Sequence, residues 1–134
     1  MRYLDAAAVT AALTPAAAVE AITAALIAGY DPATDAARTS ARTSRGHFLL
    51  MPSEVGEYAG VKVATVAPDN PAAGLPRIQA SYLLFGAATL TLQAVFDGTA
   101  LTALRTPAVS IAAVRPVLHR INEPLRVVVF DAGS

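Results

Sequence analysis

The sequence predicts an α+β domain with two N-terminal helices, then a mainly antiparallel sheet, then a further helix. Near the start of the chain, apolar residues recur at helical spacing between residues that favour helix ends. From His47 onward, short segments of β-branched and aromatic residues are separated by proline, glycine and asparagine, as in strands joined by turns. A segment rich in small residues follows Asp97 and favours a helix. The 134 residues suffice for one such domain.

The first two helices are predicted from their capping residues. Asp5 can cap a helix over residues 6–13, because its carboxylate can accept hydrogen bonds from the first free backbone N–H groups. Thr14 supplies a second cap, and Pro15 suits the first position of a helix over residues 15–28. Residues 30–46 are polar and predict a loop of unusual length, a type of segment that often carries function.

Four segments then predict the strands of the sheet. They are "HFLLM", "GVKVATVA", "IQASYLLFG" and "TLQAVFDG". A proline- and glycine-rich connection, "PDNPAAGLPR", separates the second from the third. Residues 78–96 carry no charge over a length that could span a membrane. Polar residues interrupt this stretch and Gly-Ala-Ala lies in its middle, so we expect a hairpin of two strands instead.

The last predicted helix contains a proline. The segment "TALTALRTPAVSIAAV" follows Asp97 and is expected to end near Arg115, just before another proline. Pro107 lies inside it and leaves two starting points open. Either Thr106 caps a helix that begins at Pro107, or the helix begins near Thr102 and lacks one backbone hydrogen bond.

Composition excludes several classes of function. Ten basic and ten acidic residues balance, which gives no electrostatic reason to expect nucleic acid or an anionic membrane as a partner. The chain has no cysteine, so disulfides and thiolate metal sites are excluded. His47 and His119 lack metal-ligand spacing, and we expect no metal site. The start "MRYLDAAAV" does not resemble a secretion signal, and we expect a soluble, cytoplasmic protein.

Lys62 is the first candidate for a binding residue. It is the only lysine in the chain and stands inside the apolar segment "GVKVATVA". With the two-residue period of a strand it shares a face with Ala64 and Val66, whose small side chains leave room for a ligand. A charge in an apolar strand is costly unless it is paired or borders a cavity. A lysine that protects an edge strand against aggregation explains the pattern equally well.

Arginines provide the other candidates. Arg105 lies near the start of the last predicted helix among apolar residues, where its guanidinium could hold a carboxylate or a phosphate. An ordinary ion pair with Asp97 is the competing interpretation. Arg38, Arg42 and Arg45 occur along the polar loop, and a solvated loop would account for them too.

Three motifs indicate a known family. They are "LLMP", "GVKVATVAPDNP" followed by "GLP", and "DGTALTALRT". In this order and spacing they resemble the amino-terminal lobe of the ornithine cyclodeaminase/mu-crystallin family. The similarity extends more weakly back to "MRYLDAAAVTAAL" and forward into "LRVVVFDAG", so it covers nearly the whole chain.

The resemblance implies an activity and a set of site residues. Members use NAD(H) or NADP(H) on small amino or imino acids, as cyclodeaminases, amino acid dehydrogenases or ketimine reductases, and are typically homodimers. Their first lobe provides dimer contacts and binds the substrate, and a Rossmann domain follows. Lys62 matches the family's substrate-binding lysine and Arg105 its carboxylate-binding arginine. Arg38 lies where a second such arginine is expected, and Met51 of "LLMP" is a pocket wall.

The end of the sequence departs from the family pattern. Residues 125–130 predict a buried strand, which in the family leads into a glycine-rich phosphate turn. Asp131 stands where the first glycine of that turn belongs. We therefore expect residues 1–120 to form the substrate-binding and dimerisation lobe. Residues 121–134 would form a linker and the first strand of a Rossmann domain that begins but is not completed.

This departure bears on activity. We expect the chain alone to bind no cofactor, to contain no catalytic residue and to be inactive, as a truncated part of a larger enzyme. Two alternatives stay open: a stand-alone, non-catalytic homodimer that binds a small carboxylate or serves a structural role, and one subunit of a split enzyme.

Overall fold

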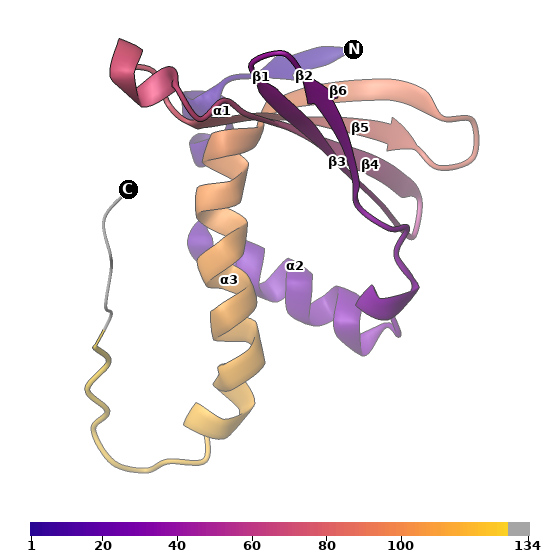
Figure 1. Cartoon of the computed structure of the whole chain (residues 1–134). Coiled ribbons are helices and arrows are strands. Elements are labelled where there is room, and N and C mark those ends of the chain that lie inside the picture. Colours follow the sequence, from indigo (N-terminus) through magenta and orange to yellow (C-terminus); the bar gives the residue numbers. More distant parts are fainter. Residues whose placement is uncertain (129–134) are drawn as a thin grey trace.

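A computed structural model describes residues 1–128 of the chain and shows an α+β fold (Figure 1). The elements are, in chain order, β1 (Arg2–Leu4), α1 (Ala6–Ala12), α2 (Pro15–Ile27), the 3-10 helix η1 (Pro32–Thr34), β2 (Thr39–Thr43), β3 (Gly46–Val55), β4 (Tyr58–Val66), the 3-10 helix η2 (Asn70–Ala73), β5 (Ile78–Gly86), β6 (Thr91–Asp97) and α3 (Gly98–Leu118). The predicted fold class is confirmed.

The strands form one sheet in the order β1-β6-β5-β4-β3-β2. From β2 to β6 each strand pairs antiparallel with the next in sequence, and β1 joins β6 in parallel. The helices lie on one side of this sheet. α3 begins at the sheet and runs away from it, with α2 packed against it (Figure 1). The mainly antiparallel order expected from the sequence is therefore confirmed.

The helix caps form as predicted, but the last helix is longer than expected. Asp5 accepts a hydrogen bond from the backbone N–H of Ala8, and Thr14 caps α2. Asp97 caps α3, which runs on through Pro107. Both predicted starting points of this helix are thus wrong. The N–H that Pro107 lacks does not end the helix, because Ala108 and Ala112, which follow this proline, pack the helix against α2.

Two edge strands were missed and one predicted strand is wrong. β1 has only three residues, and all five residues of β2 are exposed, so neither shows an alternating apolar pattern. Residues 125–128 form no strand, while residues 129–130 of that prediction lie outside the described residues. A strand needs a neighbouring backbone for its hydrogen bonds, and residues 125–128 run beside α3, away from the strands of the sheet (Figure 1).

The uncharged stretch of residues 78–96 forms the predicted hairpin, with β5 and β6 paired antiparallel. Within residues 1–128, no single helix is long and apolar enough to cross a membrane. α1 and α2 reach that length and composition only as a pair bent by 69°.

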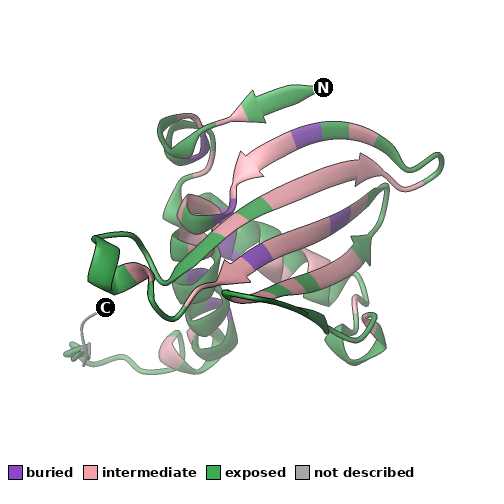
Figure 2. Cartoon of the chain, turned by 45° about the horizontal axis from the view of Figure 1, so that its top comes forward, coloured by how far each residue is buried: buried purple, intermediate pink, exposed green. Residues whose placement is uncertain are grey.

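The buried core is small and built mainly from alanine. Its main cluster joins α2 to α3 through Ala18, Val19, Ala108 and Ala112, with Ile22 packed against it. Such short side chains let two helices approach closely. No large side chain is fully buried in the described part of the chain. Much apolar surface therefore remains exposed on the sheet and the helices, where Figure 2 shows intermediate and exposed residues.

Gly98 sets where α3 begins relative to the sheet. A Cβ atom at this buried position would lie 2.7 Å from the backbone carbon of Ala80 and 2.8 Å from the backbone nitrogen of Ser81. Because these neighbours are backbone atoms of β5, they cannot rotate away. Only glycine therefore allows the first turn of α3 to approach the sheet this closely.

We predict that Gly98→Ala lowers the free energy of unfolding by about 1–3 kcal/mol, because the added methyl group overpacks the contact between α3 and β5. Thr99→Ala, at the next and exposed helix position, is the control and should change stability by less than about 0.5 kcal/mol. Urea unfolding followed by circular dichroism measures both. Equal stability of the two variants would contradict the close approach.

Candidate functional site

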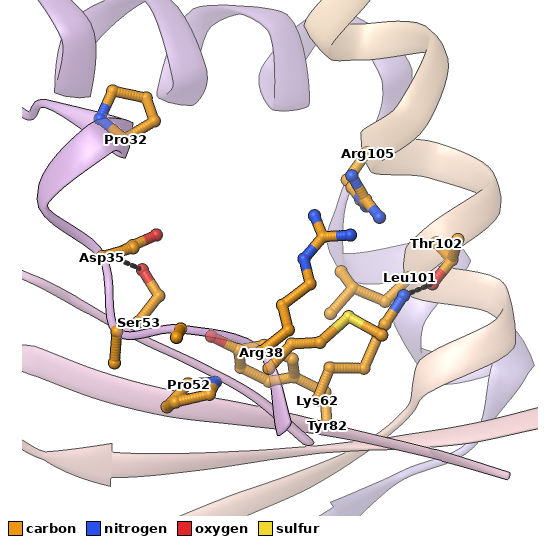
Figure 3. Close-up of a pocket in the computed structure, with 13 residues that line it drawn as sticks. Pro32, Asp35, Arg38, Pro52, Ser53, Lys62, Tyr82, Leu101, Thr102 and Arg105 are labelled. Atoms are coloured by element: carbon orange, nitrogen blue, oxygen red, sulfur yellow. Dashed lines mark hydrogen bonds between the residues drawn. The ribbon is translucent and has the colours of Figure 1, made fainter. Parts of the chain in front are cut away.

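A cavity of about 610 Å³ lies between the sheet and the start of α3. Its walls come from β3, β4, β5, the first two turns of α3, and the segment that follows α2 (Figure 3). All four residues that the sequence singled out for substrate binding line it: Arg38, Met51, Lys62 and Arg105. Residues 67 positions apart in sequence thus meet in one place, whereas Arg42, Arg45 and the two histidines do not line this cavity.

Lys62 projects from the middle of the sheet toward α3. β4 pairs with β3 on one side and β5 on the other, so the edge-strand interpretation of Lys62 is wrong. Its Nζ donates a hydrogen bond to Oγ1 of Thr102 at 3.4 Å, and that hydroxyl donates to the backbone oxygen of Gly98 at 2.6 Å. Met51 is its direct neighbour on β3. Sequence reasoning missed Thr102, although it lies one helical turn before Arg105.

Three cations meet in the cavity. In Figure 3 the guanidinium groups of Arg38 and Arg105 lie close together above the lysine. Burial lowers the pKa of Lys62, and the positive charges of Arg105 and Arg38 lower this pKa further. Within residues 1–128 the one ion pair is between Arg115 and Glu20, far from this group. In the described part of the chain, no aspartate or glutamate therefore forms an ion pair with any of these three cations.

The alternative pairing of Arg105 with Asp97 does not form. The carboxylate of Asp97 instead accepts a hydrogen bond from the backbone N–H of Ala100, 2.8 Å away, at the start of α3. A guanidinium in this position can hold an oxyanion with two parallel hydrogen bonds. The cavity wall is thus suited to a carboxylate or phosphate.

A carboxylate stands on the opposite wall. Asp35 follows η1 and accepts hydrogen bonds from the hydroxyl groups of Tyr30 and Ser53, the latter at 3.0 Å. The two hydroxyl oxygens lie 3.2 Å apart. The hydrogen bond to Asp35 is the main cause that raises the pKa of Tyr30. No pattern in the sequence indicates this group, because an aspartate in a polar loop is usually solvated.

Tyr82 forms the floor between the two walls. It is the neighbour of Lys62 on β5, and its ring meets that of Phe96 edge to face with centroids 6.2 Å apart. Its hydroxyl lies directly over Gly60, where a Cβ atom would come within 2.0 Å. Burial raises the pKa of Tyr82, and the nearby Tyr30 and Asp35 raise this pKa further. Gly60 therefore makes room for the floor of the cavity.

Within residues 1–128, no group of three or more histidine, aspartate or glutamate side chains is placed to hold a metal ion. The charged groups of the cavity are three cations and one carboxylate. Such a set can bind and orient a small polar ligand.

Comparison with known proteins supports the resemblance seen in the sequence. The model of the ornithine cyclodeaminase/mu-crystallin family matches residues 3–123. The SAR DEFICIENT 4 protein of Arabidopsis thaliana is 44% identical over 71 residues, which are 50% of this chain and 22% of that protein.

Solved structures match over a larger part of the chain. Δ1-pyrroline-2-carboxylate reductase from Thermococcus litoralis, in complex with NADH and L-proline, matches with a TM-score of 0.73 and 30% identity, over 86% of this chain and 37% of that one. An archaeal alanine dehydrogenase dimer with bound NAD matches with a TM-score of 0.73 and 26% identity, over 84% and 36%. This chain thus spans little more than a third of these enzymes.

We predict that Lys62 titrates below the ordinary lysine pKa and that Arg105→Ala raises its pKa. Removal of a nearby positive charge favours the protonated amine, so the shift must be upward. Because Lys62 is the only lysine, ¹³C-labelled lysine gives a single ε-carbon NMR signal whose pH dependence reports this pKa.

Arg115→Ala is the matched control, since this arginine pairs with Glu20 between α2 and α3 and should leave the pKa of Lys62 unchanged. A titration of Lys62 that is the same in all three proteins would show that the cations do not interact.

Proposed function

The chain belongs to the ornithine cyclodeaminase/mu-crystallin family, and we propose that it is the substrate-binding and dimerisation lobe of an NAD(P)-dependent enzyme acting on a small amino or imino acid. The observation that carries this proposal is the group of three cations, Arg38, Lys62 and Arg105, on one wall of the cavity. The absence of cysteine fits a reducing compartment, and a cytoplasmic location is part of the proposal.

The chemistry of substrate binding follows from these side chains. Arg105 holds the carboxylate with paired hydrogen bonds, and Arg38 and Lys62 supply further donors and positive charge. Thr102 orients the ammonium group of Lys62. Met51 provides an apolar wall for the hydrocarbon part of the substrate. Both kinds of contact are needed to bind a small amino or imino acid.

The residues described here do not fit a dinucleotide site. Such a site needs a glycine-rich turn that joins a parallel strand to a helix, with the helix N-terminus facing the diphosphate. In residues 1–128 the one parallel pair is β1 with β6, and β1 leads directly to Asp5, whose carboxylate occupies the N-terminus of α1. In this proposal residues 1–120 are the lobe and residues 121–134 a linker, and the chain alone binds no NAD(P) and is inactive.

The homodimer is assigned to the face of the sheet that the helices leave open. Alternation from Lys62 places apolar residues of four strands on this outward face: Phe48, Leu50, Val61, Val63, Leu83, Phe85 and Val95. Phe48 and Leu50 are 41% and 37% exposed. An apolar patch of this kind favours association. We assign a second copy of the chain as the occupant, and the matching alanine dehydrogenase is itself a dimer.

We predict that the chain binds L-proline and that Arg105→Ala weakens binding about ten-fold or more, because a hydrogen-bonded charge contributes roughly 1.5–3 kcal/mol. Isothermal titration calorimetry measures both affinities. Arg77→Ala, an exposed arginine outside the cavity, should bind like the wild type. The same titration with NADH should give no micromolar binding.

Retained affinity in Arg105→Ala would overturn the carboxylate site. Micromolar binding of NADH would overturn the division of roles between this chain and a cofactor domain.

We predict that the chain sediments as a dimer at tens of micromolar and that Leu50→Asp shifts it to monomer, because a charge buried in an apolar interface is costly. Leu75→Asp introduces the same change at an exposed leucine in the connection before β5 and should stay dimeric. A wild type that is already monomeric, or a dimeric Leu50→Asp, would contradict the assignment of this face.

A further inference from the structure

The cavity is electrically polar from one wall to the other. The side chains of Arg38, Lys62 and Arg105 carry positive charge on the wall next to α3. Asp35 lies across from them, on the side away from Arg105 in Figure 3. A ligand whose only charge is a carboxylate would pair with the three cations and would leave Asp35 without a positively charged partner.

We propose that Asp35 accepts a hydrogen bond from the protonated nitrogen of the ligand and thereby selects zwitterions over plain carboxylates. This inference rests on the proposed function, because it takes the carboxylate to be held by the three cations. It adds a specificity-determining residue that neither the sequence motifs nor the resemblance pointed to.

Asp35 has no cationic partner in the described residues and can accept further hydrogen bonds. Its partners are the hydroxyl groups of Tyr30 and Ser53, which are neutral donors, and no ion pair involves it within residues 1–128. A carboxylate offers about four acceptor sites. Two remain after these contacts.

Asp35 also borders open space on two sides. A second cavity of about 480 Å³ adjoins the first, and both are lined by Asp35, Ala36, Pro52 and Ser53. Its carboxylate is therefore accessible to a ligand in the main cavity. Tyr30 lies in the segment that follows α2 and Ser53 lies on β3, so the hydrogen bond to Ser53 fixes the loop that carries Asp35 to the sheet.

Tyr82 separates the two charged regions. Lys62 is its neighbour on the adjacent strand, and Asp35 lies close enough to its hydroxyl to raise the pKa of Tyr82. A small zwitterion lying over this ring would place its carboxylate toward the cations and its nitrogen toward Asp35. A ligand without the nitrogen charge would desolvate Asp35 and return no hydrogen bond, which is a strong basis for discrimination.

The experiment compares L-proline with (S)-tetrahydrofuran-2-carboxylate, in which an ether oxygen replaces the protonated nitrogen of the same ring. Calorimetry with the full chain should give at least about ten-fold tighter binding of L-proline, as expected for one charged hydrogen bond. In Asp35→Asn the preference should fall to about two-fold or less, while the affinity for the ether analogue stays unchanged or increases, since a repelling charge has been removed.

Asp31→Asn is the matched control. Asp31 is exposed, caps η1 four residues earlier and does not line the cavity, so the preference for L-proline should survive. Tyr30→Phe and Ser53→Ala keep the charge of Asp35 and remove one support each, and should reduce the preference only in part. If Asp35→Asn fails to fold, the preference for L-proline in these two variants tests the role of Asp35 in its place, and an unchanged preference in both would contradict that role.

Three outcomes are distinct. Equal wild-type affinity for the two ligands would overturn the role of Asp35 and leave the carboxylate site intact. A preference that persists in Asp35→Asn would assign the selection to another group. Failure of the wild type to bind either ligand would overturn the proposed function itself.

Discussion

The contact between the first turn of α3 and β5 is the constraint on which the site depends. Gly98 lets the helix start against the sheet backbone. Thr102 and Arg105 follow one and two turns later, and therefore stand above the lysine of β4. A wider separation would leave Lys62 without its hydroxyl partner and would move the guanidinium away from it. The lack of a side chain at Gly98 thus determines where Thr102 and Arg105 lie relative to Lys62.

The small core and the open cavity have the same origin. α2 packs on α3 through alanines, and α3 itself is the main helix in contact with β5. Because α3 meets the sheet mainly at β5 and less at β4, the inward sides of β3 and β4 stay partly open, and the space there is the cavity. The apolar residues that would fill a larger core lie instead on exposed surfaces. The high apolar content of the sequence is therefore reflected in exposed surface more than in a buried core.

Sequence reasoning found residues that conflict with their surroundings. Lys62 and Arg105 are charges within apolar segments, and a conflict of this kind indicates function. Asp35 and Thr102 cause no such conflict, because a loop aspartate and a helical threonine are ordinary in sequence. Their roles depend on contacts with residues 18 and 40 positions away, which only the fold brings together. The same holds for β2, whose residues are all exposed and owe their strand to pairing alone.

Protonation of Lys62 and binding of an anion are linked through the same cluster. Burial and two arginines lower the pKa of Lys62, which means that the empty cavity disfavours the third positive charge. A bound carboxylate offsets the repulsion and raises the pKa again. Because the ligand binds more tightly when Lys62 is protonated, binding above the lowered pKa is coupled to proton uptake, and affinity decreases as pH rises through that range. The mutual repulsion of the three cations in the empty cavity is relieved when an anion binds, and this relief favours anionic ligands.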